Sequence, residues 1–391
     1  MRVLLLHNRY QIPGGEDAVV RQETAMLRDA GLAVDLLEVD NDAITSTAGK
    51  ISTAMFAAYS PSARRLVAGR IRAFRPDIVH VHNFFPRLTP SVYDACRDAR
   101  VPVIQTLHNY RIVCANALLF RENRVCTDCL GRTVPFPALR HGCYRDSRIG
   151  SAALVTLIGV HRIRQTWTRR VTRFIALTEF ARDLFTEHAG IPHGQIAIKP
   201  NAAPDPGQGD GSGGYALFIG RLSQEKGIAT LLEAAVSGLG MPLKIAGSGP
   251  LQPIVEAAQI PGRIEYLGQQ DPEQVRGLMR QARVLLIPSL WFEGLPMVVP
   301  EAFGAGLPII ASRIGALETL IDDGGNGLLA EPGNAASWVE AVRRFSTEPG
   351  LEQRLRQKAR QTYEILYRPE ANVRLLLQIY EQAQAVGLPI P

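Results

Sequence analysis

Short apolar runs alternate with a stretch of helical periodicity at the start of the chain. Residues Arg2–Leu6 form an apolar run that ends in the polar pair His7–Asn8, and after a glycine-containing loop apolar residues recur at helical spacing over positions 18–30. A second apolar run, Ala33–Val39, follows directly. The order strand, loop, helix, strand is typical of an α/β protein with a parallel sheet.

Two more apolar runs, Ile78–Val81 and Val101–Leu107, predict further buried strands of the same sheet. Each run leads into a histidine and an asparagine, His82–Asn83 and His108–Asn109. The carboxyl ends of parallel strands are where open α/β sheets bind ligands. We therefore expect these polar pairs to lie at the ligand-binding edge of the sheet.

The same pattern restarts in the second half of the chain. Tyr215–Gly220 is an apolar run, a polar loop continues to Gly227, and a helical pattern over positions 228–236 leads to another run, Pro242–Ala246. Further strand-like runs are Val284–Ile287 and Pro308–Ala311. The second half therefore predicts a second sheet of the same kind.

A segment rich in proline and glycine, 201–214, separates the two halves and predicts a linker. We expect two Rossmann-like domains, 1–200 and 215–366, that face each other across a cleft lined by the carboxyl ends of both sheets. Residues 367–391 carry apolar positions at helical spacing. They predict a C-terminal helix that packs on either domain and can cross back to the first.

Length and composition agree with two soluble domains. The chain has 391 residues, of which 46% are hydrophobic and 20% charged, and 43 Lys and Arg against 37 Asp and Glu give a net charge of +6. These values exclude a disordered chain and a small disulfide-stapled scaffold, because each half is long enough to bury its own core.

No targeting or membrane-spanning segment is expected. The apolar run Val3–Leu6 is shorter than the hydrophobic region of a signal peptide, and Ile149–Val160 is too short to cross a bilayer. The chain has five cysteines, which without a secretion signal indicate a reducing compartment. We predict a cytoplasmic protein.

The strongest chemical cluster lies between Pro288 and Ala302, at the end of a predicted strand and the start of a helix. Glu293 should lie in the loop and Glu301 about one and a half turns into the helix, with Pro296 in its first turn. The amides of Met297 and Val298 and the helix dipole would then favour an anion.

A basic loop on the preceding strand end completes a nucleotide-sugar site. Gly220–Gly227 contains Arg221 and Lys226, whose cationic groups suit a diphosphate. The carboxylates Glu293 and Glu301 suit the hydroxyl groups beside it. Gly247 and Gly249 occupy a third strand-end loop, where missing side chains would let a ligand approach the backbone.

These loops resemble glycosyltransferase family 4, whose members have the GT-B fold. Glu293 and Glu301 look like the family's E-x7-E motif, and Gly220–Arg221 with Lys226–Gly227 looks like its G-R-x5-K-G type loop, here with four residues between Arg and Lys. The segment 12–16 resembles its N-terminal glycine loop, and Thr106–His108 its active-site histidine. The resemblance extends over nearly the whole chain.

The resemblance implies retaining sugar transfer from a nucleoside diphosphate sugar to a glycan or lipid-linked glycan acceptor, in the building of a bacterial surface polysaccharide. The diphosphate would be held by Arg221 and Lys226, the ribose by Glu301 and the donor sugar by Glu293, with His108 beside the anomeric carbon. The implied catalytic residues are His108, Arg221, Lys226 and Glu293. The implied donor-binding residues are Gly15, Gly220, Gly247, Gly249, Gly294, Leu295, Met297, Val298 and Glu301. Pro296 departs from the pattern, because some relatives have a glycine there.

No divalent ion is expected in catalysis, because Arg221 and Lys226 can neutralise the departing diphosphate, so activity should persist in chelator. Asp40-Asn41-Asp42 formally matches the D-x-D pattern of metal-dependent transferases but reads as an ordinary loop. The first loop lacks the G-x-G-x-x-G pattern, so NAD is not expected.

Four cysteines, Cys114, Cys126, Cys129 and Cys143, raise the question of a structural zinc site. Cys126 and Cys129 form a C-x2-C pattern that suits tetrahedral zinc, but the outer spacings are equally compatible with reduced thiols. Both interpretations stay open. Cys96 lies in a helical pattern and is predicted to be core.

Eight arginines fall between residues 140 and 173, against one acid, Asp146. Nearby apolar residues would let this stretch lie on an anionic membrane, such as the inner face of the plasma membrane, if the acceptor is lipid-linked. A solvated charged face is the alternative.

A nucleic-acid or membrane-surface binding module with degenerate catalytic loops is a rival function, although sparse aromatic residues argue against nucleic acid. Epimerisation and synthesis of a free disaccharide are enzymatic rivals.

Overall fold

The computed structural model describes residues 1–9, 15–41 and 46–387, and the chain divides into two compact units. Unit 1 comprises Met1–Leu119, Cys126–Pro200 and the C-terminal segment from Asn372, and unit 2 comprises Phe120–Val125 and Asn201–Ala371. Within the glycine loop, Ile12–Gly14 lie outside the described residues, as does Asp42 of the D-x-D pattern.

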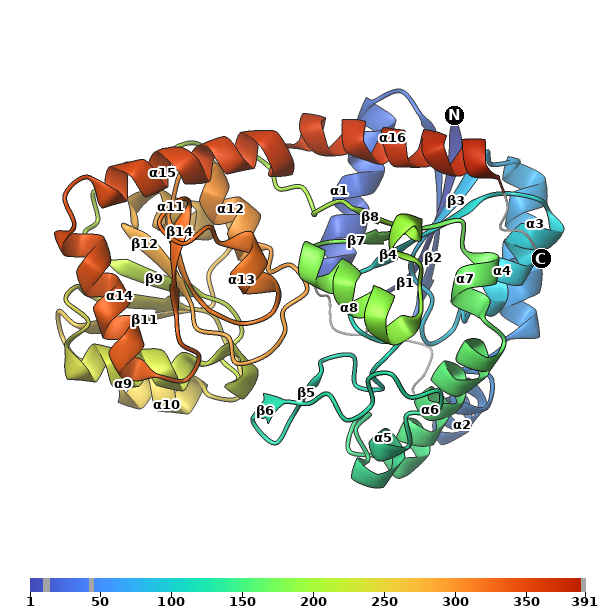
Figure 1. Cartoon of the computed structure of the whole chain (residues 1–391), viewed down its shortest axis with the longest axis horizontal. Helices are drawn as coiled ribbons and strands as arrows, with labels where there is room; N and C mark the ends of the chain where they lie inside the picture. Colours follow the sequence, from blue (N-terminus) through green and yellow to red (C-terminus); the bar gives the residue numbers. More distant parts are fainter. Residues whose placement is uncertain (10–14, 42–45, 388–391) are drawn as a thin grey trace. The chain divides into compact units, whose positions relative to one another are not determined.

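Unit 1 contains a six-stranded parallel sheet in the order β2-β1-β3-β4-β7-β8 (Figure 1). Its strands are β1 (Arg2–Arg9), β2 (Ala33–Asp40), β3 (Ile78–Asn83), β4 (Val103–Leu107), β7 (Arg173–Ala176) and β8 (Ile196–Ile198). Its helices are α1 (Gly15–Asp29), α2 (Thr47–Met55), α3 (Pro61–Phe74), α4 (Ser91–Asp98), α5 (Phe136–His141), α6 (Arg148–Ile163), α7 (Thr166–Arg170), α8 (Glu179–Ala189) and α16 (Pro369–Val386). A short hairpin, β5 (Phe120–Arg121) and β6 (Arg124–Val125), interrupts the segment between β4 and α6.

The core of unit 1 is continuous through its central strands and the C-terminal helix. Leu5, Ile78 and Ile104 are fully buried, and Leu376 and Tyr380 of α16 pack against them. The C-terminal helix therefore completes the core of the N-terminal half of the chain. Cys96 is fully buried, which confirms the prediction that it is core.

Unit 2 contains a second six-stranded parallel sheet, in the order β11-β10-β9-β12-β13-β14. Its strands are β9 (Ala216–Ile219), β10 (Leu243–Ala246), β11 (Ile264–Gly268), β12 (Val284–Ile287), β13 (Ile309–Ser312) and β14 (Gly327–Ala330). Its helices are α9 (Ile228–Gly238), α10 (Gln252–Ala257), α11 (Pro272–Gln281), α12 (Val298–Gly304), α13 (Ala316–Leu320), α14 (Ala335–Thr347) and α15 (Leu351–Thr362).

In both sheets the strand order reverses beside the first strand, between β1 and β3 in unit 1 and between β9 and β12 in unit 2. The loops at such a reversal diverge to opposite faces, and ligands bind in the crevice that they leave. The order in unit 2 is that of the classical dinucleotide-binding sheet. The predicted fold class, α/β with two Rossmann-like domains, is confirmed.

The segment predicted as a linker, 201–214, is hydrogen-bonded along unit 2. Gly209 and Gly213 donate their backbone N–H groups to the carbonyls of Ala305 and Gln281, at 2.9 Å each. A Cβ at Gly209 would lie 2.2 Å from the carbonyl oxygen of Arg280. Its glycines therefore permit close packing of this segment on the unit.

No helix in the described ranges combines the length and apolar character that a membrane span requires.

Candidate active site

The loop after β9 packs tightly against the end of β12. It carries a short 3₁₀ turn, Gln224–Lys226, that ends at Gly227 with a left-handed backbone, φ 70°. A Cβ on Gly227 would lie 1.9 Å from the carbonyl oxygen of Pro288, so only glycine fits there. Leu290 donates its N–H to the carbonyl of Glu225 at 2.8 Å, which joins the two loops on either side of the strand reversal.

This packing brings Lys226 and Glu293 together. The Lys226 ammonium lies 2.7 Å from Oε1 of Glu293, and Ser289 donates its hydroxyl to the same oxygen at 2.6 Å. The Glu293 carboxylate is buried, with the residue only 4% exposed, whereas the Lys226 side chain is partly exposed and its ammonium stands over the Trp291 ring. The buried carboxylate therefore fixes the direction of a cation whose remaining N–H donors can reach a ligand.

Arg221 begins the same loop and is exposed. Within the described part of the chain no ion pair is recorded for its guanidinium, in contrast to Lys226. The structure thus places two cations on one strand-end loop, one oriented by a buried acid and one available to an incoming anion.

The structure gives a reason for glycine at positions 247 and 249 that the sequence did not reveal. A Cβ on Gly247 would lie 1.9 Å from the carbonyl oxygen of Gly220, and one on Gly249 would lie 2.5 Å from that of Leu222. The loop after β10 therefore packs directly on the loop that carries Arg221. These glycines therefore have a packing role that supports the basic loop, and their approach by a donor stays a prediction.

Helix α12 begins later than predicted. Met297 is its N-cap and Val298 its first residue, so Pro296 lies just before the helix and Glu301 falls in its first turn. Val299 donates its N–H to the carbonyl of Pro296 at 3.0 Å, a tight i to i+3 turn that delays the helix. The prediction of Pro296 in the first turn was therefore wrong.

Glu301 lies in a poorly solvated position. Burial raises the pKa of its carboxyl to about 7, and Arg276 offsets only part of that effect. A carboxyl near its titration point at neutral pH is unusual for a surface helix and typical of ligand-binding clefts. Of the neighbouring residues predicted to frame the donor, Leu295 is buried, while Gly294, Met297 and Val298 are partly exposed.

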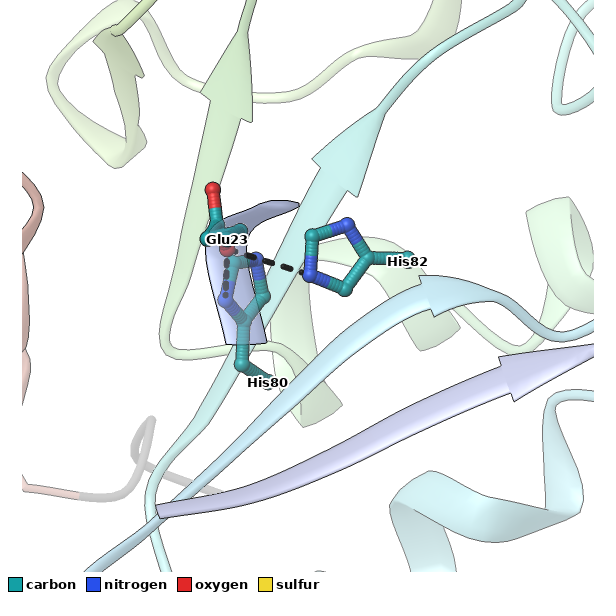
Figure 2. A group of neighbouring side chains, drawn as sticks. All are labelled: Glu23, His80 and His82. Atoms are coloured by element: carbon teal, nitrogen blue, oxygen red, sulfur yellow. Dashed lines mark ion pairs between the residues drawn. The ribbon is translucent and has the colours of Figure 1, made fainter. Parts of the chain in front are cut away.

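In unit 1, His108 follows β4 and contacts His82 at the end of β3. His82 Nδ1 lies 3.0 Å from His108 Nε2, and the two rings are stacked. His82 Nε2 lies 3.1 Å from Oε1 of Glu23, which α1 contributes (Figure 2). His82 therefore lies between the Glu23 carboxylate and the ring of His108.

The same carboxylate anchors two further groups. Lys199 donates to Oε2 of Glu23 at 2.9 Å, and His80 Nδ1 lies 3.3 Å from Oε1. Burial alone would raise the pKa of Glu23, but Lys199, followed by His82, outweighs it and holds that pKa well below the ordinary value. Glu23 is therefore an anion in the interior, compensated mainly by Lys199.

His82 and His108 both stay neutral at neutral pH. Burial, with the neighbouring His80, lowers the pKa of His82 to about 4. Burial, with His82, also lowers the pKa of His108 well below its ordinary value. At neutral pH His108 therefore offers a neutral imidazole that donates or accepts hydrogen bonds and carries no charge.

Glu23, His80 and His82 place three potential metal ligands within 4.8 Å of one another. The ammonium of Lys199 already occupies one side of the carboxylate, and a second cation there would be repelled. The ring nitrogens of His80 also lie 2.8 Å from the Tyr380 hydroxyl and 2.7 Å from that of Thr106. The arrangement is that of an ion-pair network and not of a metal centre.

Gly15 is the first residue of α1, directly after the part of the glycine loop that is not described. The start of α1 is anchored by Asp17, whose Oδ1 lies 2.8 Å from Nε2 of the buried His7. Burial is the main cause that lowers the pKa of His7.

Sequence reasoning placed His82 and His108 at the ligand-binding edge of the sheet but missed Glu23, His80 and Lys199. The alternation His80-Val81-His82 was a usable signal, because residues two apart on a strand share one face of the sheet. Glu23 and Lys199 gave no such signal, since only the fold brings α1 and the residue after β8 to that face.

The Glycosyl transferases group 1 family matches residues 207–362, and the Glycosyl transferase 4-like domain matches residues 14–202. An uncharacterized glycosyltransferase of Methanocaldococcus jannaschii is 32% identical over 34% of this chain, and the match spans 38% of that protein. The phosphatidyl-myo-inositol mannosyltransferase of Mycobacterium leprae is 25% identical over 85% of this chain and 84% of that protein.

Among solved structures, HepE of Anabaena in complex with UDP is similar, with a TM-score of 0.68 and 15% identity over 98% of this chain and 100% of that chain. At that identity the likeness establishes the fold. With the two family matches, which occupy both halves of the chain, it identifies this protein as a glycosyltransferase of the GT-B fold, similar to family 4.

Proposed function

We propose that this glycosyltransferase moves a sugar, with retention of anomeric configuration, from a nucleoside diphosphate sugar to a lipid-linked glycan acceptor in bacterial polysaccharide biosynthesis. The observation that carries the donor assignment is the contact of Lys226 with buried Glu293, beside Arg221 on the same loop. The structure of HepE with UDP is that of a protein with the same fold and supports a nucleotide donor.

The charges suit the departure of a diphosphate. As the bond between the anomeric carbon and the diphosphate oxygen breaks, its electron pair stays with the diphosphate, and the sugar becomes oxocarbenium-like. Arg221 and Lys226 would stabilise the growing negative charge, and Glu293 holds Lys226 in place before the reaction begins. Glu293 would keep Lys226 in position while contacting the donor sugar, and the backbone of Gly294–Val298 would frame that sugar.

Glu301 would accept hydrogen bonds from the ribose hydroxyls, and His108 would hydrogen-bond donor sugar hydroxyls near the anomeric carbon. A neutral imidazole suits this role, because a cation at that point would oppose the positive charge that develops on the sugar. The low pKa values of His82 and His108 support the neutral state.

Unit 1 offers a site for the acceptor. A cavity of about 520 Å³ is lined by Phe85, Ile149 and Tyr144, together with the cationic Arg111 and Arg145. The Arg111 guanidinium lies over the rings of Phe85 and Tyr144, at 4.8 and 5.8 Å. An apolar wall with two guanidinium groups suits a lipid that carries a phosphate-linked glycan.

The helices around this cavity support association with the inner face of the plasma membrane. Large apolar side chains are exposed on α2, α5 and α6, among them Met55, Phe136 and Ile149, which is 78% exposed. Arg140 and Arg148 are exposed on the same helices. Apolar side chains surrounded by arginines favour an anionic lipid surface.

The test is a panel of UDP-, GDP- and ADP-sugars, followed for nucleotide release with and without a lipid-linked glycan in anionic vesicles. We expect one nucleotide to be preferred and its release to depend on the acceptor. Product analysis by NMR should show the anomeric configuration of the donor. An inverted product, or release of a free disaccharide or an epimerised sugar nucleotide, would contradict the proposal.

Donor binding is expected to tighten as the pH rises from about 6 to about 8. In the free protein the Glu301 carboxyl has a pKa of about 7, and a ribose that bonds the carboxylate favours the anion. Below that pKa binding must release a proton, which weakens it by about tenfold per pH unit. Calorimetry with the preferred nucleotide sugar measures this, because its diphosphate diester does not titrate in that range.

Glu301→Gln should remove this pH dependence and serves as the matched variant. It should also stabilise the free protein above about pH 7. The raised pKa gives Glu301 a contribution to stability that is fully present below the ordinary value of 4.5 and lost as the pH rises through about 7. An equal pH dependence in wild type and Glu301→Gln would place the titrating group elsewhere.

A further inference from the structure

Four cysteines are gathered in the segment between β4 and α6, and none of the functions above uses them. Cys114 lies in the turn after β4, Cys126 follows β6, Cys129 comes three residues later, and Cys143 follows α5. Within the described residues, which include all five cysteines of the chain, no disulfide is formed.

Cys126 is hydrogen-bonded to the turn that follows Cys114. Cys126 donates its backbone N–H to the carbonyl of Leu119 at 2.8 Å. The turn itself is held by Ala117, which donates its N–H to the carbonyl of Cys114 at 3.0 Å, and by the Cys114 thiol, which donates to Oδ1 of Asn116 at 2.9 Å. The backbone therefore brings the turn that carries Cys114 to Cys126.

Cys129 and Cys143 are both tied to the start of α5. The Cys129 thiol donates to the carbonyl of Pro135 at 3.9 Å, and Cys143 donates its N–H to the carbonyl of Ala138 at 3.1 Å. Helix α5 ends at Gly142, whose left-handed backbone, φ 64°, turns the chain so that Cys143 comes back to the first part of the helix. Hydrogen bonds in two separate parts of the segment thus bring the cysteines together in pairs.

A tight turn joins the two pairs. Leu130 donates its N–H to the carbonyl of Thr127 at 2.9 Å, which folds Cys126-Thr-Asp-Cys129 back on itself, and Gly131 continues the turn with φ 72°. The thiol of Cys129 interacts electrostatically with those of the other three cysteines, Cys114 first. The four cysteines therefore lie near one another, although they span positions 114–143.

We propose that Cys114, Cys126, Cys129 and Cys143 bind one zinc ion as four thiolates, with four protons released to solvent. The four ligands and the C-x2-C turn match a closed tetrahedral site. Among the residues that the structure describes, no three of these sulfurs lie within 4.8 Å of one another. Closing the coordination sphere therefore requires rotation of cysteine side chains about χ1 on a backbone that already converges.

Zinc would fix the wall of the cavity in unit 1. Arg111 stands three residues before Cys114, and Tyr144–Arg145 directly follow Cys143, so both ends of the segment meet at the metal. All three residues line the cavity of about 520 Å³, and Arg111 and Arg145 both stack on the Tyr144 ring. That this cavity takes the acceptor rests on the proposed function, whereas zinc binding does not.

Elemental analysis of protein purified under reducing conditions without chelator tests the proposal. We expect one zinc per chain, and none in the variant Cys126→Ser/Cys129→Ser. Cys96→Ala, which removes the cysteine that lies in the core, should keep the zinc. Substoichiometric zinc in the wild type, iron in its place, or zinc that survives loss of Cys126 and Cys129 would each overturn the assignment.

Two measurements on the wild type protect the test against misfolding of the variant. Titration with an organomercurial should release one zinc when four thiols have reacted, as followed with a metal indicator. Replacement of zinc by Co²⁺ should give the intense visible bands of tetrahedral cobalt thiolate; an octahedral spectrum would contradict four thiolate ligands.

The structural role has its own readout, which needs no acceptor. Removal of zinc should speed tryptic cleavage within residues 110–147 by at least about tenfold, because a metal site contributes folding energy to its loop directly. Cleavage within Asn201–Ala371 of unit 2 should not change. If zinc is present but its removal leaves cleavage of this segment unchanged, the ion does not hold the cavity wall, while the donor assignment in unit 2 is untouched.

Discussion

Arg221→Ala and Lys226→Ala are each expected to lower turnover by about 10²–10³-fold, which corresponds to roughly 2.7–4 kcal/mol of lost transition-state stabilisation. Both cations lie on the loop after β9. A cation that acts on the leaving diphosphate gains most of its interaction as the charge develops, so the loss should appear in kcat more than in the KM for the donor. Steady-state kinetics with the preferred nucleotide sugar measures both parameters.

The two variants differ in a way that separates charge from structure. Arg221 is exposed and carries no recorded ion pair within the described residues, so its removal leaves the packing intact. Removal of Lys226 takes a cation from the buried Glu293 and leaves the Ser289 hydroxyl in place, so thermal unfolding must accompany the kinetics. Lys358→Ala, an exposed lysine on α15, is the matched control and should leave kcat unchanged. Near-normal turnover of Arg221→Ala would remove this residue from the leaving-group site.

The fold was predictable because its signals are local and repeated. The apolar runs at the start of each half of the chain predicted the strands β1 and β9, and the loops and helices follow them in the same order. The remaining features of the fold depend on contacts between residues that are far apart in the sequence. The packing of α16 on β1 and β3 depends on Leu376 and Tyr380, whose spacing indicated a helix but not its partner.

The candidate site was predictable only in part, for the same reason. The motif residues Lys226 and Glu293 are indeed in contact, at 2.7 Å. The raised pKa of Glu301 was not visible, because it arises from burial by residues of other elements. The network behind His108 was also missed, since Glu23 is an ordinary acid in an amphipathic helix until the fold encloses it with Lys199.

Lys199→Met is expected to destabilise unit 1 by about 3–5 kcal/mol, because it leaves the Glu23 carboxylate buried without its main cation. Lys199 is 2% exposed and Glu23 4%, and their charged atoms are 2.9 Å apart. Neither group can turn to water without opening the core. Urea denaturation followed by the fluorescence of Trp167, in a Trp291→Phe/Trp338→Phe background, reports on unit 1 separately from unit 2.

The pH profile follows from the directions of the pKa shifts. The depressed pKa of Glu23 gives a contribution to stability that is present above the ordinary value of 4.5 and lost as the pH falls through the folded value. His82 acts in the same direction, because the unfolded chain takes up its proton below about 6.5 while the folded protein resists until about pH 4. Wild-type unit 1 should therefore lose stability steadily from about pH 6.5 downwards.

Glu23→Gln/Lys199→Met decides between a lost ion pair and a lost packing contact. Removing both charges abolishes the uncompensated anion, so the double variant should recover most of the stability that Lys199→Met loses. The neutral amide that replaces the Glu23 carboxylate has no proton to take up, so the acid loss of stability assigned to Glu23 should disappear and only the part due to the buried histidines, His82 among them, should remain. A double variant no more stable than Lys199→Met would mean that the aliphatic packing of Lys199, and not its charge, holds α1 against the end of β8.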